Sequence, residues 1–182
     1  MNTRIPTVNI DDMSSFRKAC DGLGRKRRWI FRGQISADWG LTTGLERALV
    51  KFVPDRRPLK DSRKAEDNLL REFRRHFHRY SGDEPLAQDK LEWLALMQHH
   101  GAATRLLDWT FSEYVALFFA IGVTAVDSRC SIWALNQTAC WANLKRTLPK
   151  DIRKRLRAND KDIRATNWIL DHARTFVAPL NP

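Results

Sequence analysis

The segment from Tyr114 to Val126 is almost entirely apolar, and it places the tightest limit on how this chain can fold. A run of this kind is expected to be buried, and it is shorter than the roughly 20 residues needed to cross a bilayer. Ser112 is expected to cap a helix here, with Glu113 in the first turn, where the helix dipole favours an acid. The sequence therefore predicts a buried core helix and no membrane role.

A polar segment, Thr104 to Thr110, lies just before this predicted helix and reads Thr-Arg-Leu-Leu-Asp-Trp-Thr. It follows the short motif Gln98-His99-His100-Gly101. Charged and hydroxyl groups leading into a core helix are costly to desolvate unless the charges are paired and the hydroxyls are hydrogen-bonded. We therefore predict that the functional site lies in this part of the chain.

The composition indicates one globular domain with a strong basic excess. The chain has 182 residues, with 32 Lys and Arg against 21 Asp and Glu, a net charge of +11. This excess favours contact with polyanions such as nucleic acid or nucleotides, although the same charges could simply solvate the surface. Cys20, Cys130 and Cys140 lack the C-x-x-C spacing of metal and redox sites, and the N-terminus lacks a signal peptide, so we predict a cytoplasmic protein with reduced thiols.

The order of the hydrophobic patterns predicts a single α+β domain, with several helices packed on a small mixed sheet. Alternating bulky residues predict strands over 29–34 and 131–136, and Gly33 would permit a close backbone approach. Residues 176–178 also have strand character, and 54–61 has the composition of an exposed loop. Helices are expected over residues 11–22, 44–50, 65–80, 91–97, 138–148 and 150–172, in addition to the one after Ser112.

The predicted helix over 65–80 has one apolar face and one basic face. The apolar face contains Leu69, Leu70, Phe73 and Phe77. The basic face contains Arg71, Arg74, Arg75 and Arg79, which form the candidate nucleic-acid surface.

Four separated motifs together resemble the FRG domain family, which is named after a Phe-Arg-Gly signature. They are Phe31-Arg32-Gly33-Gln34, Trp39-Gly40-Leu41, the paired segments 98–101 and 104–110, and Ala116-Leu117-Phe118-Phe119-Ala120. The resemblance spans Trp29 to Ala120 and implies a fold relationship rather than a particular reaction. It implies a prokaryotic or phage protein, and a further strand after residues 177–182. We therefore expect the sheet to be incomplete at the C-terminus.

The candidate catalytic residues are Arg32, Arg105, Asp108 and His99. The two guanidinium groups could form a fork for a phosphate or carboxylate. Alternatively, one of them could pair with Asp108 and simply fasten the strand to the turn. Asp108 could be a general base, could orient His99 or His100, or could cap nearby backbone amides. We predict that Arg32, Arg105 and Asp108 come together in the fold.

Further candidate ligand-binding residues lie in the same motifs: Phe31, Gly33, Gln34, Trp39, Thr104, Trp109 and Thr110. Trp39 and Trp109 are the tryptophans placed to stack on a base or a nicotinamide ring. The phosphate-binding P-loop and Gly-x-Gly-x-x-Gly motifs are absent, so the sequence names no cofactor. His76 and His78 have no third ligand at metal spacing, so no metal site is predicted.

Two classes of function remain open. The first is an enzyme acting on a nucleotide-like ligand, for which the aromatic-Arg-Gly strand has a superficial likeness to ADP-ribosyltransferases, without their Glu-x-Glu pair after Trp109. The second is a non-catalytic module that binds nucleic acid through the basic helix. A requirement for Asp108 in catalysis would favour the first, and a steep salt dependence of nucleic-acid binding would favour the second.

Overall fold

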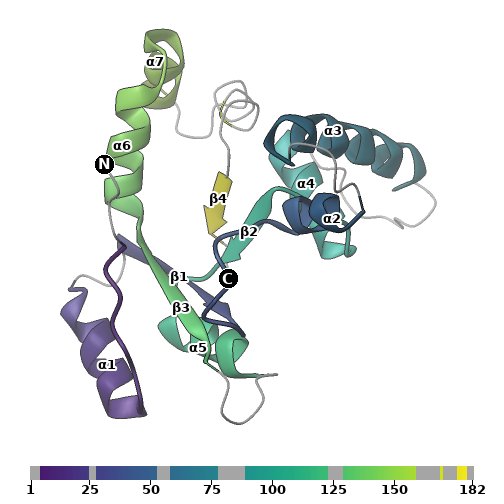
Figure 1. The fold of residues 1–182 in the computed structure, drawn as a ribbon. Helices are drawn as coiled ribbons and strands as arrows, with labels where there is room; N and C mark the ends of the chain where they lie inside the picture. The colour runs from purple at the N-terminus through teal and green to yellow at the C-terminus, as the bar shows by residue number, and fades with distance from the viewer. Residues whose placement is uncertain are drawn as a thin grey trace. The chain divides into compact units, whose positions relative to one another are not determined.

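A computed structural model describes residues 5–24, 28–52, 58–77, 89–122, 129–158, 169 and 176–179 (Figure 1). The chain divides into two compact units. Unit 1 consists of residues 1–37, 110–141 and 181–182, and unit 2 consists of residues 38–109 and 142–180. Both units contain helices and strands, which confirms the α+β class. That the whole chain forms a single domain stays a prediction.

Unit 1 is built on an antiparallel strand pair. β1 (Trp29–Gln34) pairs with β3 (Ser131–Asn136), so that Arg32 lies opposite Trp133. Helix α1 (Met13–Gly22) precedes the pair and begins at a capping box formed by Asp12 and Ser15. The two predicted strands and the predicted first helix are therefore confirmed.

Helix α5 (Glu113–Ile121) packs against β1 and begins at Ser112, whose side chain accepts a hydrogen bond from the Val115 amide, as predicted. A Cβ atom added at Gly33 would collide with the carbonyl oxygen of Ala116 and would lie 2.7 Å from the Ala120 amide nitrogen. The close backbone approach predicted at Gly33 is thus made by α5.

The prediction that the whole apolar run is buried is wrong. Within α5 the buried residues are Glu113, Ala116 and Ala120, while Phe118 is 66% exposed and Phe119 is 59% exposed. Residues three or four positions apart share one face of a helix, and α5 presents only that face to the strand pair. Residues 123–126 of the run lie outside the described residues.

Unit 2 contains a helical layer and a parallel strand pair. Helices α2 (Gly44–Phe52), α3 (Pro58–Phe77) and α4 (Lys90–His99) precede β2 (Leu106–Trp109), which pairs in parallel with β4 (Phe176–Pro179). The core of this layer is Leu70, Leu94, Met97 and Leu106. Within the described residues, the predicted mixed sheet is observed as two separate strand pairs, of which β1–β3 is antiparallel and β2–β4 is parallel.

Helix α6 (Gln137–Thr147) begins in unit 1 and continues into unit 2, where α7 (Lys150–Ala158) follows it. The helix predicted over 150–172 is observed over Lys150–Ala158, and residue 169 is also helical; residues 159–168 and 170–172 lie outside the described residues, so the rest of this prediction is not tested. The predicted loop over 54–61 is wrong in its second half, because α3 begins at Pro58. Proline suits the first helical position, since its φ angle is already helical and its missing N–H needs no partner there.

Residues 176–178 form a strand as predicted, within β4. Their pairing with β2 extends as far as Pro179, which lies opposite Trp109. That the sheet is incomplete at the C-terminus stays a prediction.

Candidate functional site

The segment 104–110 joins a buried turn to strand β2. Thr104 and Arg105 are buried just before the strand, and within it Leu106, Leu107 and Trp109 are buried while Asp108 is exposed. The two charges of this motif therefore occupy opposite environments, although only three positions separate them.

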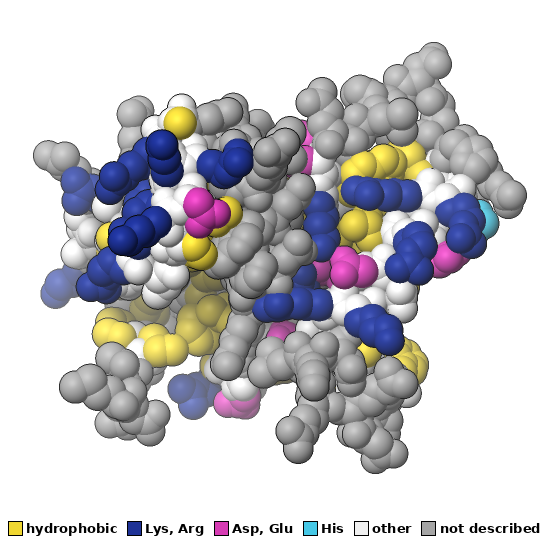
Figure 2. Space-filling model, turned by 90° about the horizontal axis from the view of Figure 1, so that it is seen from above, with side chains coloured by type: hydrophobic (Ala, Val, Ile, Leu, Met, Phe, Trp, Pro, Cys, Tyr) yellow, Lys and Arg dark blue, Asp and Glu magenta, His cyan; other side chains and the backbone are white. Residues whose placement is uncertain are grey.

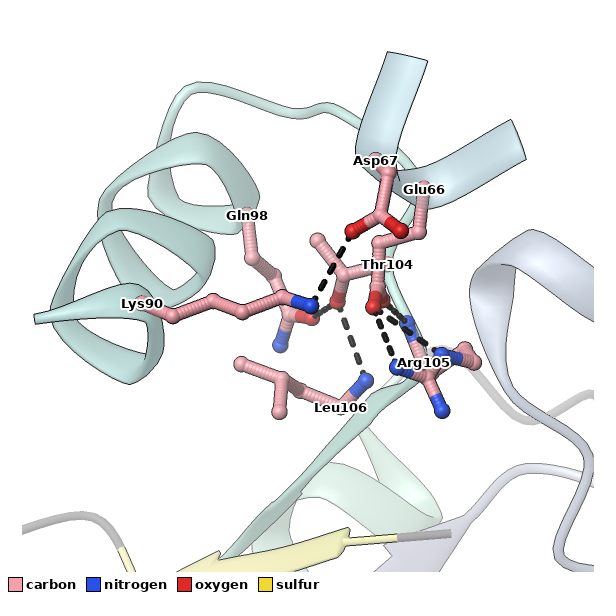
Figure 3. Close-up of polar contacts among 7 residues, drawn as sticks. All are labelled: Glu66, Asp67, Lys90, Gln98, Thr104, Arg105 and Leu106. Atoms are coloured by element: carbon pink, nitrogen blue, oxygen red, sulfur yellow. Dashed lines mark hydrogen bonds and ion pairs between the residues drawn. The ribbon is translucent and has the colours of Figure 1, made fainter. Parts of the chain in front are cut away.

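Arg105 is held by Glu66 of α3, a residue that the sequence analysis did not select (Figure 3). The Arg105 Nε and Nη2 atoms donate to Glu66 Oε2 at 2.9 and 2.7 Å, and the Arg105 backbone amide donates to Oε1 at 2.8 Å. The Glu66 side chain is 0% exposed and that of Arg105 is 7% exposed. The pair fastens α3 to the start of β2.

A signal for Glu66 was present in the helical pattern. Glu66 lies four positions before Leu70 and eleven before Phe77, and therefore on the face of α3 that is buried. A carboxylate on the apolar face of a helix requires a buried cation or hydrogen-bond donor. Arg105 in the polar motif meets that requirement.

Asp108 is oriented by a chain of hydrogen bonds that starts in the core. The Leu106 amide donates to Thr104 Oγ1 at 3.1 Å, and the Thr104 hydroxyl donates to Gln98 Oε1 (Figure 3). Gln98 Nε2 then donates to Asp108 Oδ1 at 2.5 Å. These bonds position an exposed carboxylate through the half-buried amide of Gln98, a residue of the 98–101 motif that is not among the predicted site residues.

The two histidines at the end of α4 have different surroundings. His99 is exposed in the last turn, and His100 is the C-cap. The His100 ring centroid lies 5.9 Å from that of Phe73 and 6.0 Å from that of Phe77, so His100 packs against aromatic rings of α3. His100 also lines an apolar cavity of about 410 Å³ between α3 and the end of α4.

In unit 1, the residues of the Phe-Arg-Gly motif mainly hold the strand in place. Phe31 and Thr110 exchange backbone hydrogen bonds of 2.7 and 2.8 Å, and the side-chain oxygen of buried Gln34 accepts a 2.6 Å bond from the Trp133 indole N–H. Gly33 is required by the packing of α5. These contacts account for Phe31, Gly33, Gln34 and Thr110 without a ligand; their ligand-binding role stays a prediction.

The two tryptophans selected for stacking differ in exposure. Trp39 is 50% exposed and open to a ring from solvent, whereas Trp109 is 1% exposed and would need a rearrangement first. Arg32 belongs to unit 1, while Arg105 and Asp108 belong to unit 2. That these three charges come together therefore stays a prediction.

A family model of the FRG domain matches residues 27–128, which is more than half of the chain. The chain belongs to the FRG domain family. No curated protein and no solved structure matches it. The matched part of this FRG-domain protein includes the strand of the Phe-Arg-Gly motif, the Glu66–Arg105 pair and Asp108, whereas α6 and α7 lie beyond it.

The basic face of α3 also lies within the FRG match, and two of its arginines contact other side chains of the protein. Arg71, Arg74 and Arg75 are exposed, as predicted. However, Arg74 lies 5.0 Å from the centre of the Trp93 ring, where partial burial lowers the pKa of its guanidinium, and Arg75 pairs with Glu72 at 3.3 Å. Arg79 lies outside the described residues.

The apolar face of α3 differs from its predicted pattern at one position. Leu70 and Phe77 are buried and Phe73 packs against the core, but Leu69 is 43% exposed. Leu69 lies at the edge of the apolar face and borders the cavity lined by His100, which explains its exposure.

Within the described ranges, no three His, Cys, Asp or Glu side chains are grouped so that they could hold a metal ion. None of the helices in the described part of the chain has the length and apolar character needed to span a bilayer.

Proposed function

We propose that this FRG-domain protein binds a nucleotide or another phosphate-bearing ligand through the polar groups of its Phe-Arg-Gly and 104–110 motifs. The observation that carries the proposal is the exposed Asp108 carboxylate, held by Gln98 through a chain of hydrogen bonds that begins at buried Thr104. Such a carboxylate is suited to accept a hydrogen bond from a ligand hydroxyl, for example that of a ribose, or to act as a general base.

A purely capping role explains Asp108 less well. The cap of α5 is Ser112, which binds the Val115 amide. The side chain of Asp108 instead receives the Gln98 amide from α4, and that amide is itself fixed by Thr104. Orientation by a second layer of side chains is the arrangement that functional groups need when they must be held in one geometry.

The two arginines have different parts in the proposal. Arg105 is a positioning residue, because its guanidinium and its backbone amide both bind Glu66 and thereby fix the turn that contains Thr104. Its charge is compensated by a buried carboxylate, so a phosphate would have to displace an ion pair to use it. Arg32 is accordingly the arginine proposed to bind phosphate.

A panel of inorganic phosphate, AMP, ATP and NAD⁺ tests the proposal with the full chain. We expect one member to raise the melting temperature, and the shift to grow with the logarithm of its concentration above the Kd, because a ligand that binds only the folded state stabilises it. Asp108→Asn and Arg32→Gln should each weaken that shift. Asp21→Asn, a matched charge change at an exposed position of α1, is the control and should leave it unchanged. Absence of any shift, or an undiminished shift in both variants, would refute the proposal.

The alternative proposal is a non-catalytic nucleic-acid module that uses α3. It is favoured by the exposure of Arg71, Arg74 and Arg75 on one helix. Replacing them with Gln should weaken binding similarly for all nucleic-acid sequences and flatten its salt dependence, since phosphate contacts carry little base information. Unchanged binding would assign these arginines to solvation.

A further inference from the structure

The C-terminal half of α6 and the whole of α7 form a helical pair outside the region matched by the FRG domain. Leu148, Ile152, Leu156 and Ile169 form a buried cluster, against which Leu144 of α6 packs. The Arg153 guanidinium closes the turn, because its Nη2 donates to the carbonyl oxygens of Leu148 at 3.0 Å and Arg146 at 3.5 Å. The pair therefore has its own core and a fixed connection.

This helical pair has a large excess of positive charge. Between residues 137 and 158 the chain has seven basic side chains and one acidic side chain, Asp151. The basic residues are Lys145, Arg146, Lys150, Arg153, Lys154, Arg155 and Arg157. Figure 2 shows Lys and Arg side chains gathered over these helices, on the left of the view. Like charges at this density repel one another, and a polyanion would relieve that repulsion.

Three of these cations form a row along the outer face of α7. Lys150, Lys154 and Arg157 are exposed and recur at intervals of four and three residues, which places them on one side of the helix. Ile152 and Leu156 occupy the other side and are buried. At 1.5 Å per residue the row covers about 10 Å, which corresponds to roughly three nucleotide steps along one strand.

We propose that the α6–α7 surface, defined by Lys145, Arg146, Lys150, Lys154 and Arg157, binds the phosphate backbone of nucleic acid. An anionic membrane fits less well, because a membrane-surface helix inserts an apolar face and that of α7 is already used in its core. The proposal goes beyond the ligand site described above and does not depend on Asp108 or Arg32.

The α6–α7 surface is better suited to phosphate than the arginines of α3. On α3, the aromatic ring of Trp93 contacts Arg74 and the carboxylate of Glu72 contacts Arg75. On α7, the single carboxylate of Asp151 stands among five basic residues. A nucleic acid would have to displace these contacts of Arg74 and Arg75 in order to use the basic face of α3.

Two triple variants with equal charge changes test the inference. The first is Lys150→Gln, Lys154→Gln and Arg157→Gln on α7, and the second is Arg71→Gln, Arg74→Gln and Arg75→Gln on α3. Binding of the full chain to a labelled 20-nucleotide single strand and to a 20-base-pair duplex is measured by fluorescence anisotropy between 50 and 300 mM salt. Vesicles with 30% phosphatidylserine provide the membrane arm, and circular dichroism checks folding.

We expect the α7 triple variant to lose about 10- to 100-fold in affinity at 0.1 M salt, and its salt slope to fall by about 2. The α3 triple variant should lose less. The inference is overturned if the wild-type chain binds neither nucleic acid, if the α7 variant loses no more than the α3 variant, or if vesicles are bound in preference to nucleic acid. A nucleotide panel that fails while the anisotropy result holds would refute only the ligand site.

Discussion

The two charges of the 104–110 segment have separate tasks. Arg105 is buried and bound to a buried carboxylate, Glu66, whereas Asp108 is exposed and held by the neutral amide of Gln98. A charge enclosed with its counter-charge stabilises the connection between two elements, because removing either partner leaves the other unpaired in a medium of low polarity. A charge that is oriented but still in contact with water is available to a ligand. Within one short motif, a buried and paired charge thus lies close to an exposed and oriented one.

The largest expected effect on stability comes from breaking the buried Glu66–Arg105 pair. Glu66→Ala leaves the Arg105 guanidinium and backbone amide without their carboxylate, and should lower the free energy of unfolding by about 3–5 kcal/mol. Urea denaturation followed by circular dichroism measures this. The double variant Glu66→Leu with Arg105→Met should recover part of the loss, because it removes both charges together but still leaves the backbone amide of residue 105 without its acceptor. A loss below about 1 kcal/mol for Glu66→Ala would contradict a structural role for the pair.

A smaller effect on stability is expected at Thr104, which precedes Arg105 and bonds the side chain of Gln98. Thr104→Val removes the hydroxyl that serves both the Leu106 amide and Gln98, in a buried position, and should cost about 1–3 kcal/mol. Thr104→Ser keeps the hydroxyl and is the matched control, with a smaller loss in the same urea titration. Equal losses in the two variants would show that the methyl group matters rather than the hydrogen bonds.

At the hydrogen bond between Gln98 and Asp108, a change of charge should alter stability more than a loss of packing. Gln98→Leu removes the amide that holds Asp108 and, at a half-buried position, should cost about 0.5–1.5 kcal/mol. Gln98→Glu should cost more, since it places a second carboxylate against Asp108. Thermal denaturation at pH 7 in low and high salt provides the measurement, and salt should narrow the difference between the two variants. Identical melting temperatures in low salt would argue against the Gln98–Asp108 contact.

The smallest effect on stability is expected at Asp108 itself. Asp108→Asn keeps an oxygen that can accept the Gln98 bond and should change the free energy of unfolding by no more than about 0.5 kcal/mol. The same variant should weaken nucleotide binding, as measured by isothermal titration calorimetry. A loss of stability comparable to that of Glu66→Ala would show that Asp108 has a structural role, and would remove the contrast between Arg105 and Asp108.

Much of the local structure could be predicted from the sequence. Ser112 caps α5, Gly33 lies where another backbone comes close, and the strands at 29–34 and 131–136 were recognisable from their alternating residues. These features depend on a few neighbouring residues. The exposure of Phe118 was not predictable in this way, because α5 is apolar on every side and only the strand pair against which it packs selects the buried face.

By itself, the sequence determined the α+β class, the FRG family and the position of the polar motif, because each depends on residues close together in the chain. Only the tertiary structure decided which of the motif's charges is structural. Glu66 lies 39 positions before Arg105, and Asp108 lies three positions after it. The sequence offered Asp108 as a partner for either arginine and did not identify Glu66, which the packing of α3 against the start of β2 brings to Arg105, while Asp108 lies at the surface. A buried charge pairs with whatever counter-charge the fold brings into the same enclosed space, and distance along the chain has no part in that choice.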